Sequence, residues 1–217
     1  MKTKLTILLG LLLMFSAFTS EKQVITIFTI GDSTMANKPL EGGNPERGWG
    51  QMLSRYFSEE IVIDNHAVNG RSSKSFIDEG RWDKVLAKLK KGDYVFIQFG
   101  HNDEKRDEKR HTDPGTTFDA NLKRFVEEAR AKGAIPVLFN SIVRRNFGKA
   151  DADAVAKAVV QDDIREGIDP NAPQAEVNTG ARLIDTHGAY LDSPHNVARE
   201  LEVPFVDLNR VTHDLVE

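Results

Sequence analysis

The sequence predicts an α/β fold in which helices cover both faces of a five-stranded parallel sheet. Apolar, β-branched segments of strand length alternate along the chain with segments whose apolar residues recur at helical spacing. Because crossovers between parallel strands are right-handed, this alternation favours a three-layer α/β/α arrangement. The 217 residues contain neither an internal repeat nor a low-complexity linker, so we expect one domain with one core.

Five short apolar segments, rich in branched and aromatic side chains, are predicted to be the strands. The first reads Val-Ile-Thr-Ile-Phe-Thr-Ile. Each of the five is followed by a polar or glycine-containing segment. The predicted strands cover residues 24–30, 61–63, 94–99, 135–139 and 203–208.

Three predicted helices lie between these strands, each marked by a stripe of apolar residues at helical spacing. The stripes cover residues 49–57, 82–89 and 118–129. Two lysines and a glycine at 90–92 mark the end of the second helix, and Thr117 is a candidate N-cap of the third.

Two further features are expected between the fourth and fifth strands. Ser193 followed by Pro194 is typical of a helix start, with the serine as cap and the proline at the first helical position. The polar stretch 144–180 is predicted to be a surface insertion that contains a helix at 152–165 and helps to shape the substrate cleft.

Chemistry-bearing residues follow the first three strands. Gly-Asp-Ser-Thr-Met at 31–35 follows the first strand, Asn-Gly-Arg-Ser at 69–72 comes after the second, and Gly-His-Asn-Asp at 100–103 follows the third. Open α/β sheets keep their active sites at the carboxyl ends of the strands. A serine hydroxyl, a glycine amide and an asparagine carboxamide at three such ends would supply a nucleophile and donors for an oxyanion.

The three segments resemble those of the SGNH (GDSL-type) hydrolases and, within them, the rhamnogalacturonan acetylesterase-like carbohydrate esterases. The resemblance extends from about residue 24 to the end of the chain, and the extended form Gly-Asp-Ser-Thr-Met-Ala at 31–36 is its most specific part. It implies a flavodoxin-like strand order. It also implies that Ser33 is the nucleophile and that the Ser33 and Gly70 amides and the Asn102 side chain form the oxyanion hole.

Each of these residues also has an ordinary structural explanation. Ser33 would suit a plain turn, Gly70 a turn that needs a positive φ, and Asn102 a cap after the third strand. Asp32 and Asp103 are expected to be hydrogen-bonding residues of their turns and not catalysts.

A serine hydrolase also needs a base, and the resemblance requires an Asp-x-x-His block near the C-terminus. Of the histidines, His187 has Ile184 three residues before it, and His213 has Arg210. Neither has the required spacing. The expectation is therefore that the catalytic Asp and His lie beyond Glu217, so that residues 21–217 are a C-terminally truncated hydrolase domain.

The start of the chain predicts export. Lys2 and Lys4 precede an apolar stretch at 5–18 and small polar residues before Glu21, which is typical of a signal peptide over residues 1–20. A periplasmic or extracellular location follows, with no membrane attachment after the signal is removed. Removal takes away both lysines and no acidic residue, which leaves 27 Lys+Arg against 33 Asp+Glu and a net charge of −6, unsuited to nucleic acid.

The predicted function is that of an exported serine esterase that removes acetyl groups from a pectic or related polysaccharide. Arg47, Arg71, Arg144 and Arg145 lie near strand exits and would suit a uronic-acid polymer, although ion pairing at the surface is the ordinary role of each. No cysteine is present and no histidines have metal-ligand spacing, so neither a metal nor a cofactor is expected. A GDSL-type lipase or thioesterase, or a non-catalytic carbohydrate-binding relative, are the alternatives, and the oligomeric state is left open.

Overall fold

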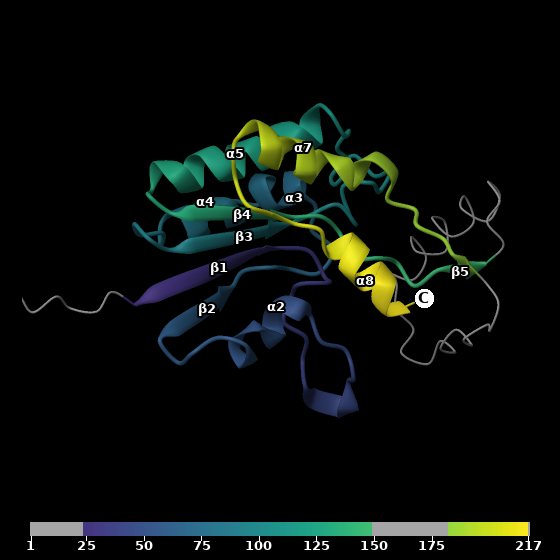
Figure 1. Ribbon diagram of the computed structural model, residues 1–217, viewed down its shortest axis with the longest axis horizontal. Helices are drawn as coiled ribbons and strands as arrows, with labels where there is room; N and C mark the ends of the chain where they lie inside the picture. The colour runs from purple at the N-terminus through teal and green to yellow at the C-terminus, as the bar shows by residue number, and fades with distance from the viewer. Residues whose placement is uncertain (1–23, 149–181, 217) are drawn as a thin grey trace, which may run out of the picture.

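The computed structural model describes residues 24–148 and 182–216 and contains the expected parallel sheet (Figure 1). The sheet has five strands in the order β2-β1-β3-β4-β7, and all pairings are parallel. This confirms the predicted α/β class and the flavodoxin-like strand order. The strands are β1 (Ile25–Gly31), β2 (Ile61–Asn65), β3 (Tyr94–Gln98), β4 (Ile135–Phe139) and β7 (Phe205–Val206).

Helices lie on both sides of the sheet (Figure 1). On one side are α3 (Ser73–Asp78), α4 (Arg81–Leu86), α5 (Thr117–Ala131) and α7 (Asp192–Glu200). On the other side are α2 (Trp49–Met52) and α8 (Leu208–Val216). The layers agree with right-handed crossovers, because the connection from β1 to β2 runs across the sheet in the opposite direction to the later ones and so places α2 on the opposite face from α3, α4, α5 and α7.

Short elements complete the described chain. The 3₁₀ turns are η1 (Glu41–Gly43), η2 (Leu53–Arg55) and η3 (Gly188–Tyr190). Strands β5 (Phe147–Gly148) and β6 (Arg182–Leu183) form a separate antiparallel pair. The predicted signal peptide and the predicted helix at 152–165 lie outside the described residues.

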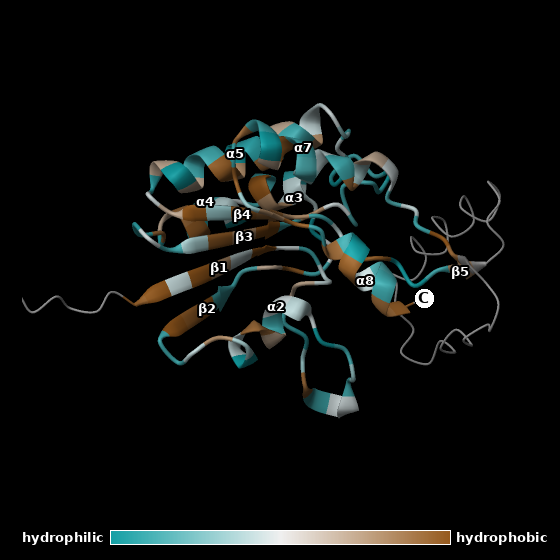
Figure 2. Cartoon of the chain, viewed as in Figure 1, coloured by the Kyte–Doolittle hydropathy of each residue, from teal (hydrophilic) through white to brown (hydrophobic). Residues whose placement is uncertain are grey.

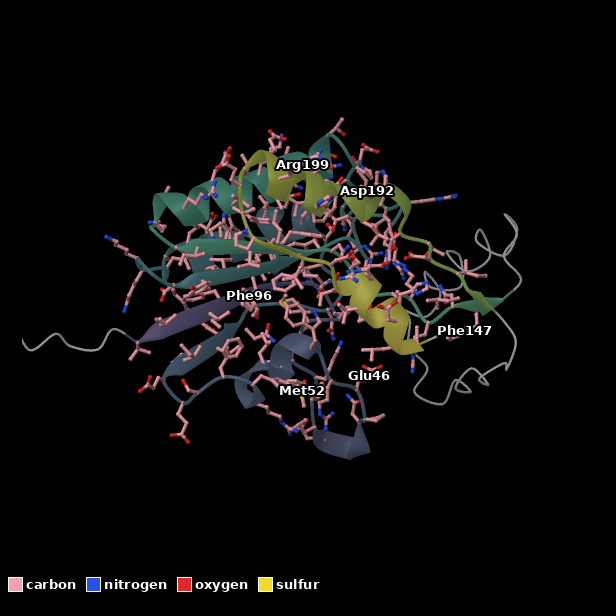
Figure 3. All side chains as sticks on the ribbon, in the orientation of Figure 1. Glu46, Met52, Phe96, Phe147, Asp192 and Arg199 are labelled. Carbon is pink, nitrogen blue, oxygen red and sulfur yellow. The ribbon has the colours of Figure 1, made fainter. Side chains whose placement is uncertain are left out.

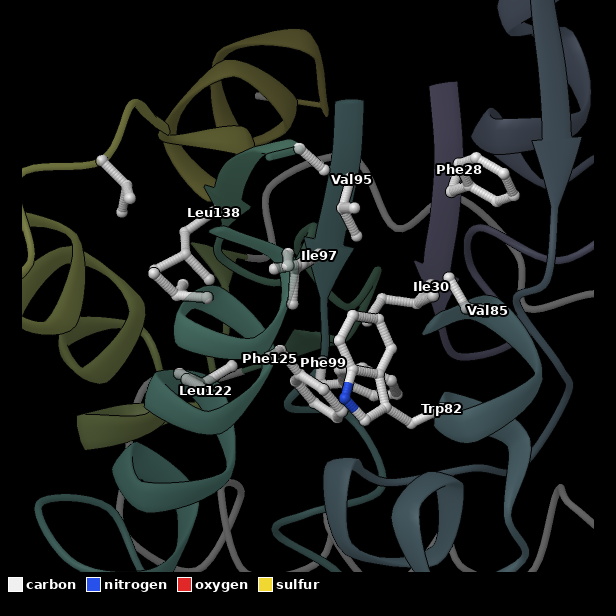
Figure 4. Close-up of a cluster of buried hydrophobic side chains, with 14 of the residues drawn as sticks. Phe28, Ile30, Trp82, Val85, Val95, Ile97, Phe99, Leu122, Phe125 and Leu138 are labelled. Atoms are coloured by element: carbon white, nitrogen blue, oxygen red, sulfur yellow. The ribbon is translucent and has the colours of Figure 1, made fainter. Parts of the chain in front are cut away.

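The main core lies between the sheet and the α4–α5 layer (Figure 4). Trp82 and Phe125 meet edge to face with ring centroids 5.0 Å apart, and Phe99 stacks on Phe125 at 5.5 Å. Apolar residues lie on the strands and on the inward sides of the helices, and polar residues lie on the outward sides of α5 and α7 (Figure 2). Burial of this apolar surface is the main term that stabilises the fold.

Helix α5 confirms the helix that was predicted from the apolar stripe over 118–129. Its apolar positions are all buried: Phe118, Leu122, Phe125, Val126 and Ala129. The N-cap, however, is Thr116, and Thr117 is the first helical residue, with its hydroxyl accepting a hydrogen bond of 2.7 Å from the Asp113 backbone N–H.

Two helix predictions are wrong. The stripe over 49–57 does not form one helix, because the chain tightens into η2 after Met52 and leaves Tyr56 80% exposed. The tighter 3₁₀ turn rotates later residues out of an α-helical stripe. Ser193 lies inside α7, which follows directly from η3 with no side-chain cap, because the incoming chain is already helical.

Candidate active site

Ser33 lies on the turn that follows β1, at the carboxyl end of the sheet. At Gly31, the last residue of β1, a Cβ atom would lie 2.5 Å from the Gln98 carbonyl oxygen on β3, so only glycine permits this close approach. The Asp32 carbonyl then accepts hydrogen bonds from the Met35 and Ala36 backbone N–H groups, at 3.2 and 3.0 Å. This tight turn presents the half-buried Ser33 at the strand exit.

The Asp32 carboxylate stabilises that turn through hydrogen bonds with Thr34. It is fully buried, and its Oδ1 accepts hydrogen bonds from the backbone N–H and the hydroxyl of Thr34, at 2.9 and 2.8 Å. Burial raises the pKa of Asp32, and the hydrogen bonds from Thr34 oppose that rise. Asp32 is therefore the turn-forming residue that the sequence predicted.

Gly70 lies in the turn after β2 with φ of +72°, a conformation that favours glycine. A Cβ atom at this position would meet nothing within 4 Å, so the residue faces open space. Within the described ranges, neither the Gly70 N–H nor the Ser33 N–H has a hydrogen-bond acceptor. Both amides are thus available to an oxyanion.

The Asn102 side chain comes from the exit of β3 and is 1% exposed. Its Nδ2 donates to the Arg71 carbonyl at 3.2 Å, and its Oδ1 accepts from Arg110 Nη1 at 3.3 Å. The first of these bonds ties the carboxamide to the residue after Gly70. One Nδ2 hydrogen is left for a further acceptor, because a carboxamide nitrogen carries two.

Asp103 holds the Gly70 and Asn102 loops together. Its carboxylate accepts hydrogen bonds from the Ser73 N–H and hydroxyl at 3.0 and 2.5 Å, from the Thr112 hydroxyl at 2.9 Å and from the Gly100 N–H at 3.2 Å. Burial raises the pKa of Asp103 to about 7, against the opposing effect of the Ser73 and Thr112 hydrogen bonds. The predicted loop role of Asp103 is confirmed.

The partners of Asp103, and helix α3 to which Ser73 belongs, were not predicted from the sequence. A local signal exists, because Ser72 and Ser75 form a capping box at the start of α3. The pairing of Ser73 with Asp103 spans 30 positions and has no local signature.

No described histidine forms a hydrogen bond with the Ser33 hydroxyl. Both ring nitrogens of the buried His187 are occupied, since Nδ1 lies 3.2 Å from Glu104 Oε2 and Nε2 lies 3.0 Å from the Ile142 carbonyl. His101 packs edge-on against His187, and its Nδ1 is 3.6 Å from Asp32 Oδ2. Burial holds the pKa of His101 well below its usual range, with the nearby charges of His187 and Arg144 acting in the same direction.

The predicted arginines are mostly engaged within the protein. Arg71 pairs with Glu79 at 3.2 Å, Arg144 pairs with Glu104, and Arg47 donates to the carbonyls of its own loop. Arg71 has the surface ion pair that was predicted as its ordinary role, whereas the ion pair of Arg144 is largely buried, with its side chain 9% exposed.

Polar side-chain atoms gather at the end of the sheet where α8 begins, and carbon predominates between the sheet and its helices (Figure 3). Within the described ranges, no group of three or more His, Asp or Glu side chains has the arrangement to hold a metal ion. None of the described helices combines the length and apolar content that a bilayer crossing requires.

A doubly wound sheet with a serine at the exit of β1 and candidate oxyanion donors at the next two exits is typical of one class of protein, the α/β serine hydrolases. Residues 29–216 match the model of the GDSL-like lipase/acylhydrolase family, and the chain belongs to that family. It is a carboxylic ester hydrolase of the serine-nucleophile type. The assignment of Ser33, Gly70 and Asn102 to the reaction remains our prediction.

Two relatives from Bacillus subtilis (strain 168) are similar in sequence. The chain is 37% identical over 196 residues to the rhamnogalacturonan acetylesterase RhgT, and this match covers 90% of this chain and 70% of RhgT. It is 38% identical over 122 residues to the probable rhamnogalacturonan acetylesterase YesY, and that match covers 56% of this chain and 55% of YesY. Among solved structures, YxiM of Bacillus subtilis has a TM-score of 0.64 at 24% identity, over 89% of this chain and 46% of that one, and shows the same fold.

Proposed function

We propose that this protein removes acetyl groups from a pectic polysaccharide of the rhamnogalacturonan type, after export from the cell. The observation that carries the proposal is the convergence of three strand exits: the half-buried Ser33 follows β1, the open Gly70 amide follows β2, and the Asn102 carboxamide follows β3. The choice of an acetylated pectic substrate is supported by the similarity to RhgT over 90% of the chain.

The proposed reaction proceeds through an acyl-enzyme. Ser33 Oγ attacks the acetyl carbonyl carbon and gives up its proton to a base. The carbonyl oxygen becomes an oxyanion that accepts hydrogen bonds from the Ser33 and Gly70 amides and from Asn102. The sugar oxygen then leaves with a proton as an alcohol, and water cleaves the acetyl-serine ester, which yields acetate and restores the hydroxyl.

The surroundings of Ser33 suit a short acyl group on a polar leaving group. Asp32 and Thr34 flank the serine in sequence, and Arg71 and Asn102 lie at the adjoining strand exits. A long acyl chain would need an apolar groove, since burial of methylene groups is what binds such substrates.

Hydrolysis of three ester substrates tests the proposal, measured as acetate release from the two saccharides and as p-nitrophenol release from the palmitate ester. The protein is incubated with acetylated rhamnogalacturonan fragments, acetylated xylo-oligosaccharides and p-nitrophenyl palmitate, with Ser33→Ala as the blank. We expect the highest kcat/KM on the rhamnogalacturonan fragments. A preference for the palmitate ester would indicate a lipase, and binding of the fragments without acetate release would indicate a carbohydrate-binding protein.

Export is tested separately, by expressing the chain with its own residues 1–20 in a Gram-negative host. We expect the protein in the periplasmic fraction, with a mass that lacks about 20 N-terminal residues. Retention of the full mass in the cytoplasm would contradict the predicted signal.

A further inference from the structure

Lys38 lies in the loop between β1 and α2, five positions after Ser33, and its ammonium group is held beside the Gly70 turn. Lys38 Nζ donates a hydrogen bond of 2.8 Å to Oδ1 of Asn69, the residue that precedes Gly70. Gln51 fixes the Lys38 backbone from α2, accepting from the Lys38 N–H at 3.0 Å and donating to its carbonyl at 3.1 Å. The positive charge is therefore positioned next to the expected oxyanion hole.

Among the described residues, this ammonium group has no carboxylate partner. In the part of the chain that the structure describes, no Asp or Glu oxygen lies within 4.0 Å of Lys38 Nζ, whereas nearby Arg71 is paired with Glu79 at 3.2 Å. Lys38 is partly buried, and this burial lowers the pKa of its ammonium, against the opposing charges of Glu46 and Asp32. A partly desolvated cation whose close partner in the described chain is a neutral amide gains from binding an anion.

We infer that Lys38 binds the carboxylate of a uronic-acid unit next to the acetylated sugar. The inference rests on the proposed function, because that polymer carries both acetyl esters and uronic acids. Asn69 uses one of the three ammonium hydrogens, and the other two are left for the carboxylate. Lys38 thereby selects acetylated substrates that carry negative charge.

The test pairs one substitution with one change to the substrate. Wild type and Lys38→Gln are compared on acetylated rhamnogalacturonan fragments and on the same fragments after their carboxylates have been reduced to primary alcohols. On the native fragments we expect Lys38→Gln to lower kcat/KM by roughly ten-fold, mainly through KM, since removal of one ion-pair partner weakens binding. On the reduced fragments the two proteins should be equal, because the interaction is already absent.

A matched control is Lys84→Gln, which removes an exposed lysine on α4, on the other face of the sheet. This variant should match wild type on both substrates. Raising the salt concentration to about 1 M should reduce the advantage of wild type over Lys38→Gln on the native fragments, because the Debye length shrinks to about 3 Å.

Equal losses on native and reduced fragments would overturn the inference and place Lys38 at the reacting group. No loss on either would also overturn it. If wild type released acetate from neither substrate, the proposed function would fail, and calorimetric titration with the same two fragments would still decide the inference. Tighter binding of native than of reduced fragments, lost in Lys38→Gln, supports it, and equal binding contradicts it.

Discussion

The two sides of the candidate active site are built differently. On the side formed by the exits of β1, β2 and β3, the Ser33 and Gly70 amides have no acceptor among the described residues, and Asn102 has a hydrogen to spare. On the side formed by β4, β7 and α8, polar groups bind one another: Asn140 donates to Asp207 at 2.8 Å, and Asn209 donates to Asp185 at 2.9 Å.

The difference indicates which part of the proposed reaction the described residues would supply. Unsatisfied, rigidly held donors are what stabilises a developing oxyanion, and they are costly unless a ligand uses them. Groups that already bind one another, such as His187 between Glu104 and the Ile142 carbonyl, are structural. We therefore predict that the first side carries out the reaction and that the second side supports the fold.

The largest effect is expected at the nucleophile. We predict that Ser33→Ala lowers kcat for acetate release by at least ~10³-fold. Thermal unfolding should be nearly unchanged, because the Ser33 side chain makes no hydrogen bond within the described ranges. Ser58→Ala, at an exposed loop position, is the control and should retain full activity.

Asn102 comes next. Loss of one oxyanion donor costs ~2.7–4 kcal/mol, so Asn102→Ala should lower kcat by roughly 10²–10³-fold with a smaller change in KM. The exposed Asn196 on α7 provides the matched change to alanine, with no expected effect. A change confined to KM would make Asn102 a binding residue and would weaken the contrast between the two sides.

Substitutions of the described histidines should have far smaller effects on kcat. If His187 only supports the fold, His187→Gln should lower kcat by less than about ten-fold per folded molecule, although the lost Glu104 contact should reduce Tm. Loss of a true triad base costs several orders of magnitude. A loss of that size in His187→Gln would show that the second side is catalytic after all.

The smallest expected effect is a change in how the thermal stability depends on pH when Asp103 is substituted. The folded-state pKa of Asp103 is about 7 and lies above its ordinary value of 3.8, so between these values the folded state binds more protons than the unfolded state. Raising the pH from 4 through 7 therefore lowers the contribution of Asp103 to the free energy of unfolding. The asparagine of Asp103→Asn does not titrate, so the variant does not lose this contribution as the pH rises. The Tm of the variant minus the Tm of wild type should therefore increase by at least ~2 °C from pH 5 to pH 8.

Other titrating groups are common to both proteins and cancel in that difference. A Tm difference that stays constant over this pH range would contradict the raised pKa of Asp103. Any loss of activity in Asp103→Asn should appear in kcat, since the residue holds Ser73 and Gly100 and is expected not to touch the substrate.

Much of the fold was predictable because the strands have strong local patterns. The segment predicted at 135–139 coincides with β4, and the motifs at the ends of the first three strands lie together as expected. Helix α3 was missed because it has only six residues and buries serines along with Phe76, which gives no apolar stripe. The hydrogen bond between Ser73 and Asp103, and the absence of a carboxylate beside Lys38 among the described residues, depend on tertiary contacts that a linear sequence does not display.

Covalent labelling tests most directly whether Ser33 is the nucleophile of an assembled oxyanion hole. The protein is treated with a fluorophosphonate, and the adduct is located by peptide mass spectrometry. We predict one adduct, on Ser33, that is absent in Ser33→Ala and forms at least ~10-fold more slowly in Asn102→Ala. An adduct on another serine, or equal labelling of Ser33→Ala, would contradict the assignment.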